Sequence, residues 1–254
     1  MNDTMTNDWR DFLYNLEKLN QSCDCFLGGD EREIKWICIH LYDSLVGAFV
    51  ASLCHGNPYA IWKSKCKYQG IAFSLDHSLE TGTAKQRGES AVHIGTHGGT
   101  HDKQIEAINS LPCIKDKQID KRDYGKIWGE FQMILKFDEL YKRCKARRDE
   151  RTNQIVNSRY MRSMLDMKSI PKDLQSEADE TLQRLRNTRN NFVHFGRKIW
   201  GIKWGYWENT LPPSAKVLNF LVNESNAFSH ESHFKSAQQM TNQVSKKIGQ
   251  IFQE

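Results

Sequence analysis

Regular helical spacing of apolar residues is the feature that most constrains this fold. From Glu31 to His55, apolar side chains recur every three or four residues, which places them on one wide face of a helix. These side chains are Ile34, Ile37, Cys38, Leu41, Leu45, Ala48, Phe49 and Leu53. A second stripe of this kind lies in Lys126–Arg148. Because alternating β-branched runs are scarce and only five prolines occur, we predict an all-α helical bundle.

Amphipathic spacing also predicts helices at both ends of the chain. Residues 1–28 should form an N-terminal helix and turn that dock outside the main bundle, and residues 29–254 should form one helical domain. Further helices are predicted at Asn153–Met167, Ile170–Phe195, Ser214–Phe228 and Phe234–Phe252. Residues 62–124 lack a helical period, apart from a short helix near Lys103–Leu111. We predict that 62–124 form an irregular insertion between the first and second bundle helices.

Three histidines of this insertion are candidates for a metal site. His93, His97 and His101 are spaced to align on one helix, but the pair Gly98-Gly99 breaks that helix. Apart from Asp102, no carboxylate or cysteine stands at a convincing spacing, and the seven cysteines show no paired C-x-x-C pattern. We therefore predict no metal and no cofactor, and we place these histidines in an exposed loop.

The composition favours a cytoplasmic protein. The number of cysteines is odd, and Met1–Arg10 is polar and acidic, unlike a signal peptide. The most apolar stretch, Ser44–Leu53, is shorter than the roughly 20 residues that cross a bilayer, so we expect no membrane contact. The formal net charge of +5 permits an anionic partner.

One stretch indicates a chemistry: Arg189-Asn190-Asn191-Phe192-Val193-His194-Phe195. On a helix, Asn190 and His194 are spaced i,i+4 and share a face. Arg189 lies about 140° round from His194, but its long side chain can reach the same cleft. An imidazole moves protons near neutral pH, and a guanidinium holds phosphate oxygens through paired hydrogen bonds. The three side chains therefore suit a phosphodiester substrate.

This stretch resembles the motif of the HEPN superfamily (higher eukaryotes and prokaryotes nucleotide-binding). That motif is an arginine, four to six residues and then a histidine, commonly with a polar residue after the arginine, as Arg189, Asn190 and His194 have here. The neighbouring residues Leu185-Arg186-Asn187 and Trp200–Pro213 also look like those of bacterial HEPN-type proteins. The resemblance implies a bundle that forms a homodimer, so that two copies of the motif face one another.

The resemblance also implies a metal-independent endoribonuclease. His194 would act as general acid or base at the ribose 2′-OH and the leaving 5′-oxygen, Arg189 would stabilise charge on the phosphate, and Asn190 would position the phosphate or His194. Many relatives are toxins or anti-phage abortive-infection effectors, so an antitoxin or a defence-system protein is an expected partner besides RNA. The alternative is a HEPN-type module that binds RNA or nucleotide, or regulates a partner, without cleaving anything.

Several further residues have both a functional and a structural interpretation. Asp43 or His40 can orient His194, or can be ordinary solvated or capping groups. The aromatic residues of Trp200–Trp207 can stack on unpaired bases, but we favour packing against the bundle. A basic cluster from Lys142 to Arg151, at the end of the predicted helix Lys126–Arg148, can be a solvated helix end or a track for RNA. We predict RNA contact for Arg147, Arg148, Arg151, Arg197 and Lys198.

Overall fold

The protein has two compact units, one helical and one built on a sheet. The computed structural model describes residues 3–54, 60–80, 83–88, 91–97, 100–114, 117–149, 151–158, 167–194, 202–228 and 234–253. The helical unit comprises Met1–Ala60 and Lys136–Glu254, and the sheet unit comprises Ile61–Leu135. Most of the described residues are helical, which confirms the mainly helical prediction. The prediction of a purely all-α fold is wrong, because the sheet unit contains four paired strands.

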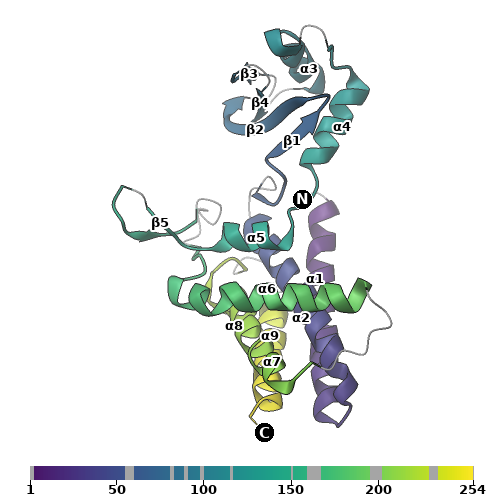
Figure 1. Ribbon diagram of the computed structural model, residues 1–254, viewed down its shortest axis with the longest axis vertical. Coiled ribbons are helices and arrows are strands. Elements are labelled where there is room, and N and C mark those ends of the chain that lie inside the picture. Colours follow the sequence, from purple (N-terminus) through teal and green to yellow (C-terminus); the bar gives the residue numbers. More distant parts are fainter. Residues whose placement is uncertain are drawn as a thin grey trace. The chain divides into compact units, whose positions relative to one another are not determined.

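Helix α2 (Ile34–Cys54) forms the centre of the helical unit (Figure 1). Leu41, Leu45 and Phe49 have no exposed surface, and buried side chains lie on several sides of the helix. The helix packs against α1 (Asp3–Leu27), α5 (Phe137–Cys144), α6 (Lys172–His194), α8 (Leu211–Asn219) and the π-helical turn η4 (Phe220–Glu224). Segments from both ends of the chain therefore share one core around α2.

The central position of α2 also explains its apolar composition. From the sequence, Ser44–Leu53 is the most apolar stretch, and it is too short to cross a bilayer. The helical segment Glu31–Cys54 is longer, and by length and composition alone it could cross a membrane. Most of its most apolar part is buried inside the helical unit. A helix that is apolar on most sides and buried in this way is typical of the core of a folded domain.

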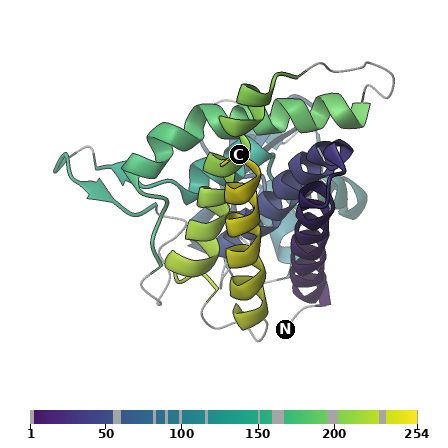
Figure 2. The ribbon, with the colours of Figure 1, turned by 90° about the horizontal axis from the view of Figure 1, so that it is seen from below.

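Helix α1 is part of the bundle, whereas the sequence suggested that it docks outside. Phe12, Leu16 and Leu19 are fully buried, and the helix packs against both α2 and the C-terminal helix α9 (Phe234–Ile251). Figure 2 shows α9 running beside α8. The apolar stripe of α1 thus completes the core between the first and the last helices of the chain.

The contact between α1 and α2 depends on a glycine. A Cβ atom on Gly47 of α2 would lie 2.9 Å from Cδ2 and 3.0 Å from Cβ of Phe12. Carbon atoms at van der Waals contact are about 3.5 Å or more apart, so any larger residue would push the two helices apart. The absence of a side chain at Gly47 lets Phe12 fill the space between them.

The second predicted bundle helix is split between the two units. Instead of one helix over Lys126–Arg148, the structure has α4 (Lys121–Phe131) in the sheet unit and α5 in the helical unit. Between them, Ile134 forms a β-bridge with Trp62, and the Leu135 amide donates to the Ile61 carbonyl at 2.9 Å. These backbone bonds to the chain entering the sheet unit replace the hydrogen bonds of a continuous helix.

The region after α5 is also less helical than predicted. β5 (Arg147–Arg148) and β6 (Ile155–Val156) form a short hairpin, so the helix expected at Asn153–Met167 is wrong where it overlaps β6. Residues 159–166 lie outside the described part of the chain. Among the closing helices, α9 (Phe234–Ile251) lies within the predicted range Phe234–Phe252. α8 (Leu211–Asn219) begins before the predicted start at Ser214, and η4 (Phe220–Glu224) continues it into the rest of the predicted range. The short helix α7 (Trp204–Glu208) precedes α8.

The insertion is an ordered α/β unit and not an irregular loop. Its mixed sheet has the strand order β1-β2-β4-β3, with β2 and β4 parallel and the outer pairs antiparallel. The strands are β1 (Lys65–Tyr68), β2 (Ile71–Glu80), β3 (Ala84–Gln86) and β4 (Ala91–His97). Alternate residues of the two central strands, such as Phe73 and Ile94, are buried. Helix α3 (His101–Asn109) packs on β3 and β4, and α4 packs on β1, so these helices cover the apolar face.

Candidate functional site

Helix α6 carries the motif residues in its last two turns. Its buried stripe, which packs towards α2 and α8, consists of Gln175, Ala178, Thr181, Leu182, Leu185 and Thr188. Arg189 and Asn190 follow as half-buried residues. His194 is the last residue of the helix, and its side chain lies outside the described part of the structure. The backbone therefore places the three motif residues on one helix, with Asn190 and His194 one turn apart.

The guanidinium of Arg189 lies against α2. Its Nη2 donates to Oδ1 of Asp43 at 3.4 Å, and its Cζ lies 5.0 Å from the centre of the Tyr42 ring. The carboxylate of Asp43 and the ring of Tyr42 thus both contact the guanidinium and hold it in place against α2. The side chain of Arg189 keeps 27% of its surface exposed, so solvent or a ligand can still reach it.

The ionisation of Asp43 and the hydrogen bonding of Arg189 are both affected by burial. Burial raises the pKa of Asp43, and the nearby charges of Arg189 and His40 offset this rise only in part. The Nε of Arg189 is buried and has no hydrogen-bond partner among the described residues. A buried donor without an acceptor is unfavourable. The guanidinium of Arg189 therefore has a hydrogen-bond donor that the described residues leave unused.

His40 lies one turn before Asp43 on α2. Its ring stacks on Trp36, with 5.8 Å between the ring centres, and its Nδ1 is buried without a partner in the described part of the chain. Burial lowers the pKa of His40, and the charges of Asp43 and Glu33 offset this only in part. Burial therefore favours the neutral form of the imidazole. Asp43 contacts Arg189, and an orienting role of either residue towards His194 remains a prediction.

A second arginine of α6 contacts α5. Arg186, one turn before Arg189, forms an ion pair with Asp138, and Tyr42 stacks on Phe137 with 4.6 Å between ring centres. The arginines thus tie the motif end of α6 to both α2 and α5. The sequence singled out Arg189 and Asp43 but missed the pair formed by Arg186 and Asp138, because neither residue departs from the polar pattern of a helix surface.

A pocket of about 320 Å³ lies beside the motif on the neighbouring face of α6. It is lined by Thr188, Asn191, Phe192, Ile202, Lys203 and Tyr206. Inside it, the hydroxyl groups of Thr188 and Tyr206 are 2.7 Å apart. The Nζ of Lys35 on α2 lies 5.7 Å from the centre of the Phe192 ring. The motif end of α6 therefore presents a small apolar hollow with cations near its edge.

The aromatic segment that follows the motif mainly packs against the bundle. Trp207 is 4% exposed and stacks on Phe192, with ring centres 6.0 Å apart. Trp204 is more open, but its ring still contacts Phe26 and Phe252 at 5.9 and 4.9 Å. These contacts favour the packing interpretation for both tryptophans. Trp200 lies outside the described residues.

The predicted RNA-binding arginines lie far from Arg189 within one chain. Arg147 and Arg148 are exposed on β5, and Arg151 is exposed in the turn of the same hairpin. The strand that leads into β5 is bonded to the start of α6, because the Ala146 amide donates to the carbonyl of Ile170. Arg189 lies 17 residues after Lys172, the first residue of α6, which corresponds to about 25 Å along the helix. Arg197 and Lys198 fall outside the described residues.

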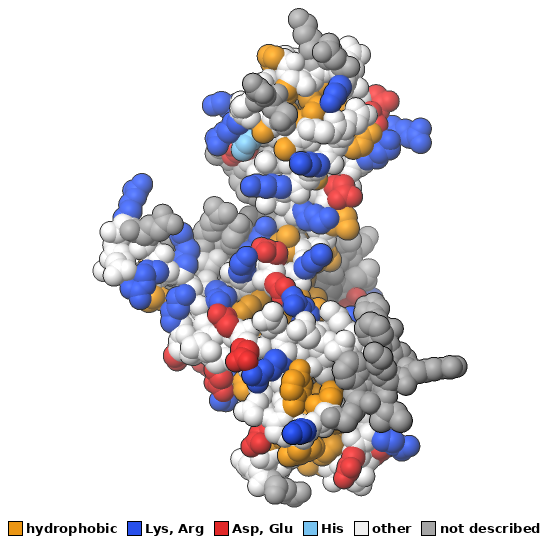
Figure 3. All heavy atoms as spheres, viewed as in Figure 1, with side chains coloured by type: hydrophobic (Ala, Val, Ile, Leu, Met, Phe, Trp, Pro, Cys, Tyr) orange, Lys and Arg blue, Asp and Glu red, His pale blue; other side chains and the backbone are white. Residues whose placement is uncertain are grey.

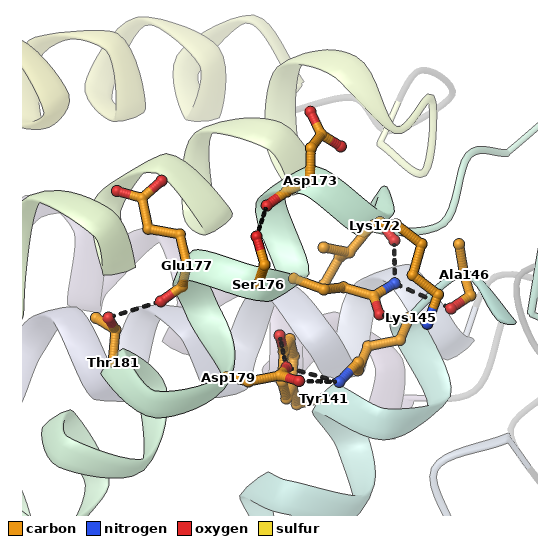
Figure 4. A network of polar contacts seen from close by, with 11 residues as sticks. Tyr141, Lys145, Ala146, Lys172, Asp173, Ser176, Glu177, Asp179 and Thr181 are labelled. Carbon is orange, nitrogen blue, oxygen red and sulfur yellow. Dashed lines mark hydrogen bonds and ion pairs between the residues drawn. The ribbon is translucent and has the colours of Figure 1, made fainter.

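A polar network fixes the first half of α6 on the segment before it (Figure 4). Asp179 accepts hydrogen bonds from Nζ of Lys145 at 2.6 and 2.7 Å and from the Tyr141 hydroxyl at 2.6 Å. The Gln175 side-chain amide donates to the carbonyls of Ala146 and Ile170 at 2.9 and 2.7 Å. Burial alone would raise the pKa of Asp179, but the hydrogen bonds from Lys145 and Tyr141 outweigh it and lower that pKa. The helix that carries the motif is thus anchored at both ends.

The candidate metal-binding histidines lie on different elements of the sheet unit. His93 is on β4, where its Nδ1 lies 3.5 Å from Asp76, and His101 begins α3. His97 ends β4, and its side chain is not described. Among the side chains that are described, no three of His, Cys, Asp or Glu lie close enough together to hold a metal ion.

Comparison with known proteins gives no further guide to the site. No family model, curated protein or solved structure matches this chain.

Proposed function

We propose that the protein is a metal-independent endoribonuclease of the HEPN type. The observation that carries this proposal is the position of Arg189, half-exposed near the end of α6, five residues before His194 on the same helix. A cation and an imidazole on adjacent turns supply charge stabilisation and proton transfer. The helical bundle around α6 is the kind of scaffold that the HEPN resemblance implies.

In the proposed reaction, His194 or its counterpart takes the proton of the ribose 2′-OH, and the 2′-oxygen attacks the phosphorus. The bond from phosphorus to the 5′-oxygen breaks, and the leaving oxygen receives a proton from the other imidazole. Arg189 holds a non-bridging phosphate oxygen while negative charge builds up on it. Asn190 positions the phosphate or His194. The products are a 2′,3′-cyclic phosphate and a free 5′-OH.

The ion pair of Arg189 and Asp43 defines the state of the proposed site before RNA binds. Without substrate, Asp43 and the Tyr42 ring hold the guanidinium. A phosphate oxygen competes with Asp43 for the same cation, and the raised pKa of Asp43 means that burial disfavours its charged form. Substrate binding then exchanges a partly desolvated carboxylate for phosphate as the partner of Arg189.

The proposal includes a homodimer. One chain supplies a single motif histidine, whereas cyclisation needs both a base and an acid. A two-fold axis near His194 would place a second imidazole opposite the first, because an isologous interface repeats each residue. Asp43 would limit repulsion between the two Arg189 side chains, since each guanidinium has its own carboxylate at 3.4 Å.

A second candidate function is RNA or nucleotide binding without cleavage. The observation that favours it is the involvement of Arg189 in the packing of α6 on α2, through Asp43 and Tyr42. In that case Arg189 is mainly a structural residue. The two functions differ in what purified protein does to RNA.

The deciding experiment is incubation of the purified protein with end-labelled RNA, with and without a chelator. We expect cleavage to 2′,3′-cyclic phosphate ends in both conditions, and a loss of about 100-fold or more in rate for Arg189→Ala and for His194→Ala. Arg186→Ala is the matched control, because it removes an arginine and an ion pair one turn away on the same helix. Unchanged cleavage by Arg189→Ala or His194→Ala would refute the site. Cleavage that a chelator abolishes and zinc restores would refute the metal-free mechanism.

The homodimer is tested by adding an excess of inactive His194→Ala chains to the wild-type protein. A composite site needs His194 of both chains, so the mixed dimers have a single imidazole and the activity of the wild-type chains should fall. A site built from one chain predicts that each wild-type chain keeps its activity in a mixed dimer. Sedimentation under the assay conditions reports the oligomeric state. A monomer that cleaves RNA at wild-type rate would rule out a composite site.

A further inference from the structure

The sheet of the sheet unit has two chemically different faces. Residues opposite one another in paired strands point to the same side of the sheet. One row across the four strands reads Lys65, Ser74, His93 and Lys85. The row beside it has Lys67, Ala72 and Ala91 on β1, β2 and β4. Both rows lie on the side away from the apolar residues Phe73 and Val92, which α3 and α4 cover.

The outer strands supply the charge of this uncovered side. Lys65 and Lys67 on β1 and Lys85 on β3 are exposed, and Arg87, directly after β3, is exposed as well. We call these four side chains the basic face. Among the described residues, no carboxylate pairs with the three lysines, and Arg87 lies 4.0 Å from Asp76. In Figure 3 lysine and arginine side chains stand out from the sheet unit.

Charge is segregated between the two sides of this unit. On the side of the sheet that carries the four cations of the basic face, the described strand residues include a single carboxylate, Asp76. Helices α3 and α4 on the opposite side are balanced: Lys103, Lys121, Arg122 and Lys126 face the same number of acids, Asp102, Glu106, Asp123 and Glu130. An excess of positive charge on one side attracts a polyanion to that side.

The size of the basic face suits an extended polyanion. Lys65 and Lys67 are about 7 Å apart along β1, and Lys65 and Lys85 are about 14 Å apart across the strands. The residues between them, such as Ala72, Ser74 and Ala91, are small, so the floor between the cations is shallow. Among the described residues of these rows, the only ring is the imidazole of His93, which is 21% exposed and lies 3.5 Å from Asp76, so the face offers contacts to phosphates more than stacking on bases.

We propose that the basic face binds the phosphate backbone of RNA. The choice of RNA rests on the proposed ribonuclease function, while the affinity for a phosphate chain rests on the charges alone. Lysines on edge strands also prevent sheets from pairing edge to edge. That role explains lysines on β1 and β3, but it does not require them to share one side or to lack partner carboxylates.

The test is RNA binding by the full chain, measured by fluorescence anisotropy over a series of salt concentrations. The probe is a labelled single strand with 2′-O-methyl groups, which cannot be cleaved by 2′-OH attack. The basic-face variant combines Lys65→Gln, Lys67→Gln, Lys85→Gln and Arg87→Gln. The matched control combines Lys103→Gln, Lys121→Gln, Arg122→Gln and Lys126→Gln, which removes the same charge from the helical side.

We expect the basic-face variant to bind at least about tenfold more weakly at low salt than the control variant does. Its slope of log affinity against log salt should be smaller by about 0.7 for each phosphate contact that is lost. Equal affinities and slopes for the two variants would overturn the proposal, and the lysines would then serve as edge protection. Circular dichroism verifies that both variants are folded.

Binding and cleavage are measured separately, so this proposal and the ribonuclease can fail independently. Weaker binding by the basic-face variant, with no cleavage by any form of the protein, would support the basic face and refute the ribonuclease. Cleavage that depends on Arg189, with unchanged binding by the basic-face variant, would support the ribonuclease and refute the basic face.

Discussion

At the residue scale, the candidate site depends on the contact between Arg189 and Asp43. The sequence indicates each of these residues by itself, but it does not predict that they meet. Arg189 stands out because of its spacing from His194, and Asp43 because it interrupts an apolar helix. Their contact joins residues 146 positions apart in the chain. It depends on how far α2 and α6 are rotated and displaced relative to one another, and side-chain packing along both helices determines that. A periodic pattern in one helix carries no information about it.

Asp43 should make the stability of the protein fall as pH rises from the acid range. Its pKa in the folded state is raised above the ordinary value of 3.8, so the folded protein binds this proton more tightly than the unfolded chain does. Ionisation therefore lowers the free energy of unfolding between pH 3.8 and the raised pKa, and the loss persists at higher pH. Asp43→Asn has no such titration.

Urea denaturation from about pH 4 to about pH 7 measures this effect. The free energy of unfolding of the wild type should decrease relative to that of Asp43→Asn as the pH rises. Asp173→Asn, at an exposed position in the first turn of α6, serves as the control. Parallel pH profiles for wild type and Asp43→Asn would show that Asp43 is not desolvated by folding.

At the element scale, the sequence predicts best where one face of a helix supplies the core. α2, α6 and α9 appear where apolar periodicity places them, because burial of that face drives their packing. The sheet was missed, although Ile71, Phe73 and Leu75 alternate as in a strand that is buried on one side. The break between α4 and α5 was missed because Ile134 and Leu135 fit a helical stripe yet pair with Trp62 and Ile61 in the structure.

The close contact of α1 and α2 predicts that Gly47→Ala destabilises the protein. The added Cβ overlaps Phe12, and the expected loss is about 1–2 kcal/mol, after the gain of helix propensity is included. Gly249→Ala in α9 is the matched control, because nothing lies within 4 Å of its added Cβ. That change should leave stability equal or raise it by up to about 1 kcal/mol. Thermal unfolding compares the two, and a Gly47→Ala protein as stable as wild type would contradict the tight contact.

The network around Asp179 predicts a loss of stability in acid. The pKa of Asp179 is lowered, so its contribution is present above pH 3.8 and disappears as the pH falls through the lowered value. Asp179→Asn should cost about 1 kcal/mol at neutral pH, a modest figure because the carboxylate is 53% exposed. The difference from wild type should shrink towards pH 3. A difference that stays constant with pH would assign the loss to packing and not to charge.

At the scale of the whole molecule, the sheet unit is inserted between two halves of the helical unit. The chain enters and leaves it through adjacent backbone segments, because the Leu135 amide bonds to the Ile61 carbonyl and Ile134 pairs with Trp62. Ala60 and Lys136, the next residues outward, are therefore close together, near the roughly 4.5–5.5 Å between Cα atoms of opposite residues in an antiparallel pair. The sequence indicated that residues 62–124 lack the helical period of the segments around them, but it did not indicate that they form a folded sheet unit.

Replacement of Ile61–Leu135 by a linker of about four Gly and Ser residues should therefore leave the helical unit folded. The shortened protein should keep a helical circular dichroism spectrum and a cooperative thermal transition, since the core around α2 loses no member. It should lose the RNA affinity assigned to the basic face. A shortened chain that is unfolded would show that the helical unit needs the insertion, and cleavage of short RNA by the folded chain would place the ribonuclease in the helical unit alone.

The packing of α1 against α9 has a consequence for synthesis on the ribosome. The sheet unit is contiguous in sequence and has all its residues once Leu135 has emerged. The helical unit cannot close until the last helix, Phe234–Ile251, has left the exit tunnel, because that helix covers α1. During that interval α2 lacks the partners that come from the second half of the chain. The nascent protein therefore carries a complete insertion and a highly apolar helix that is covered by α1 but lacks its later partners, and such exposed apolar surface is a typical target for a chaperone.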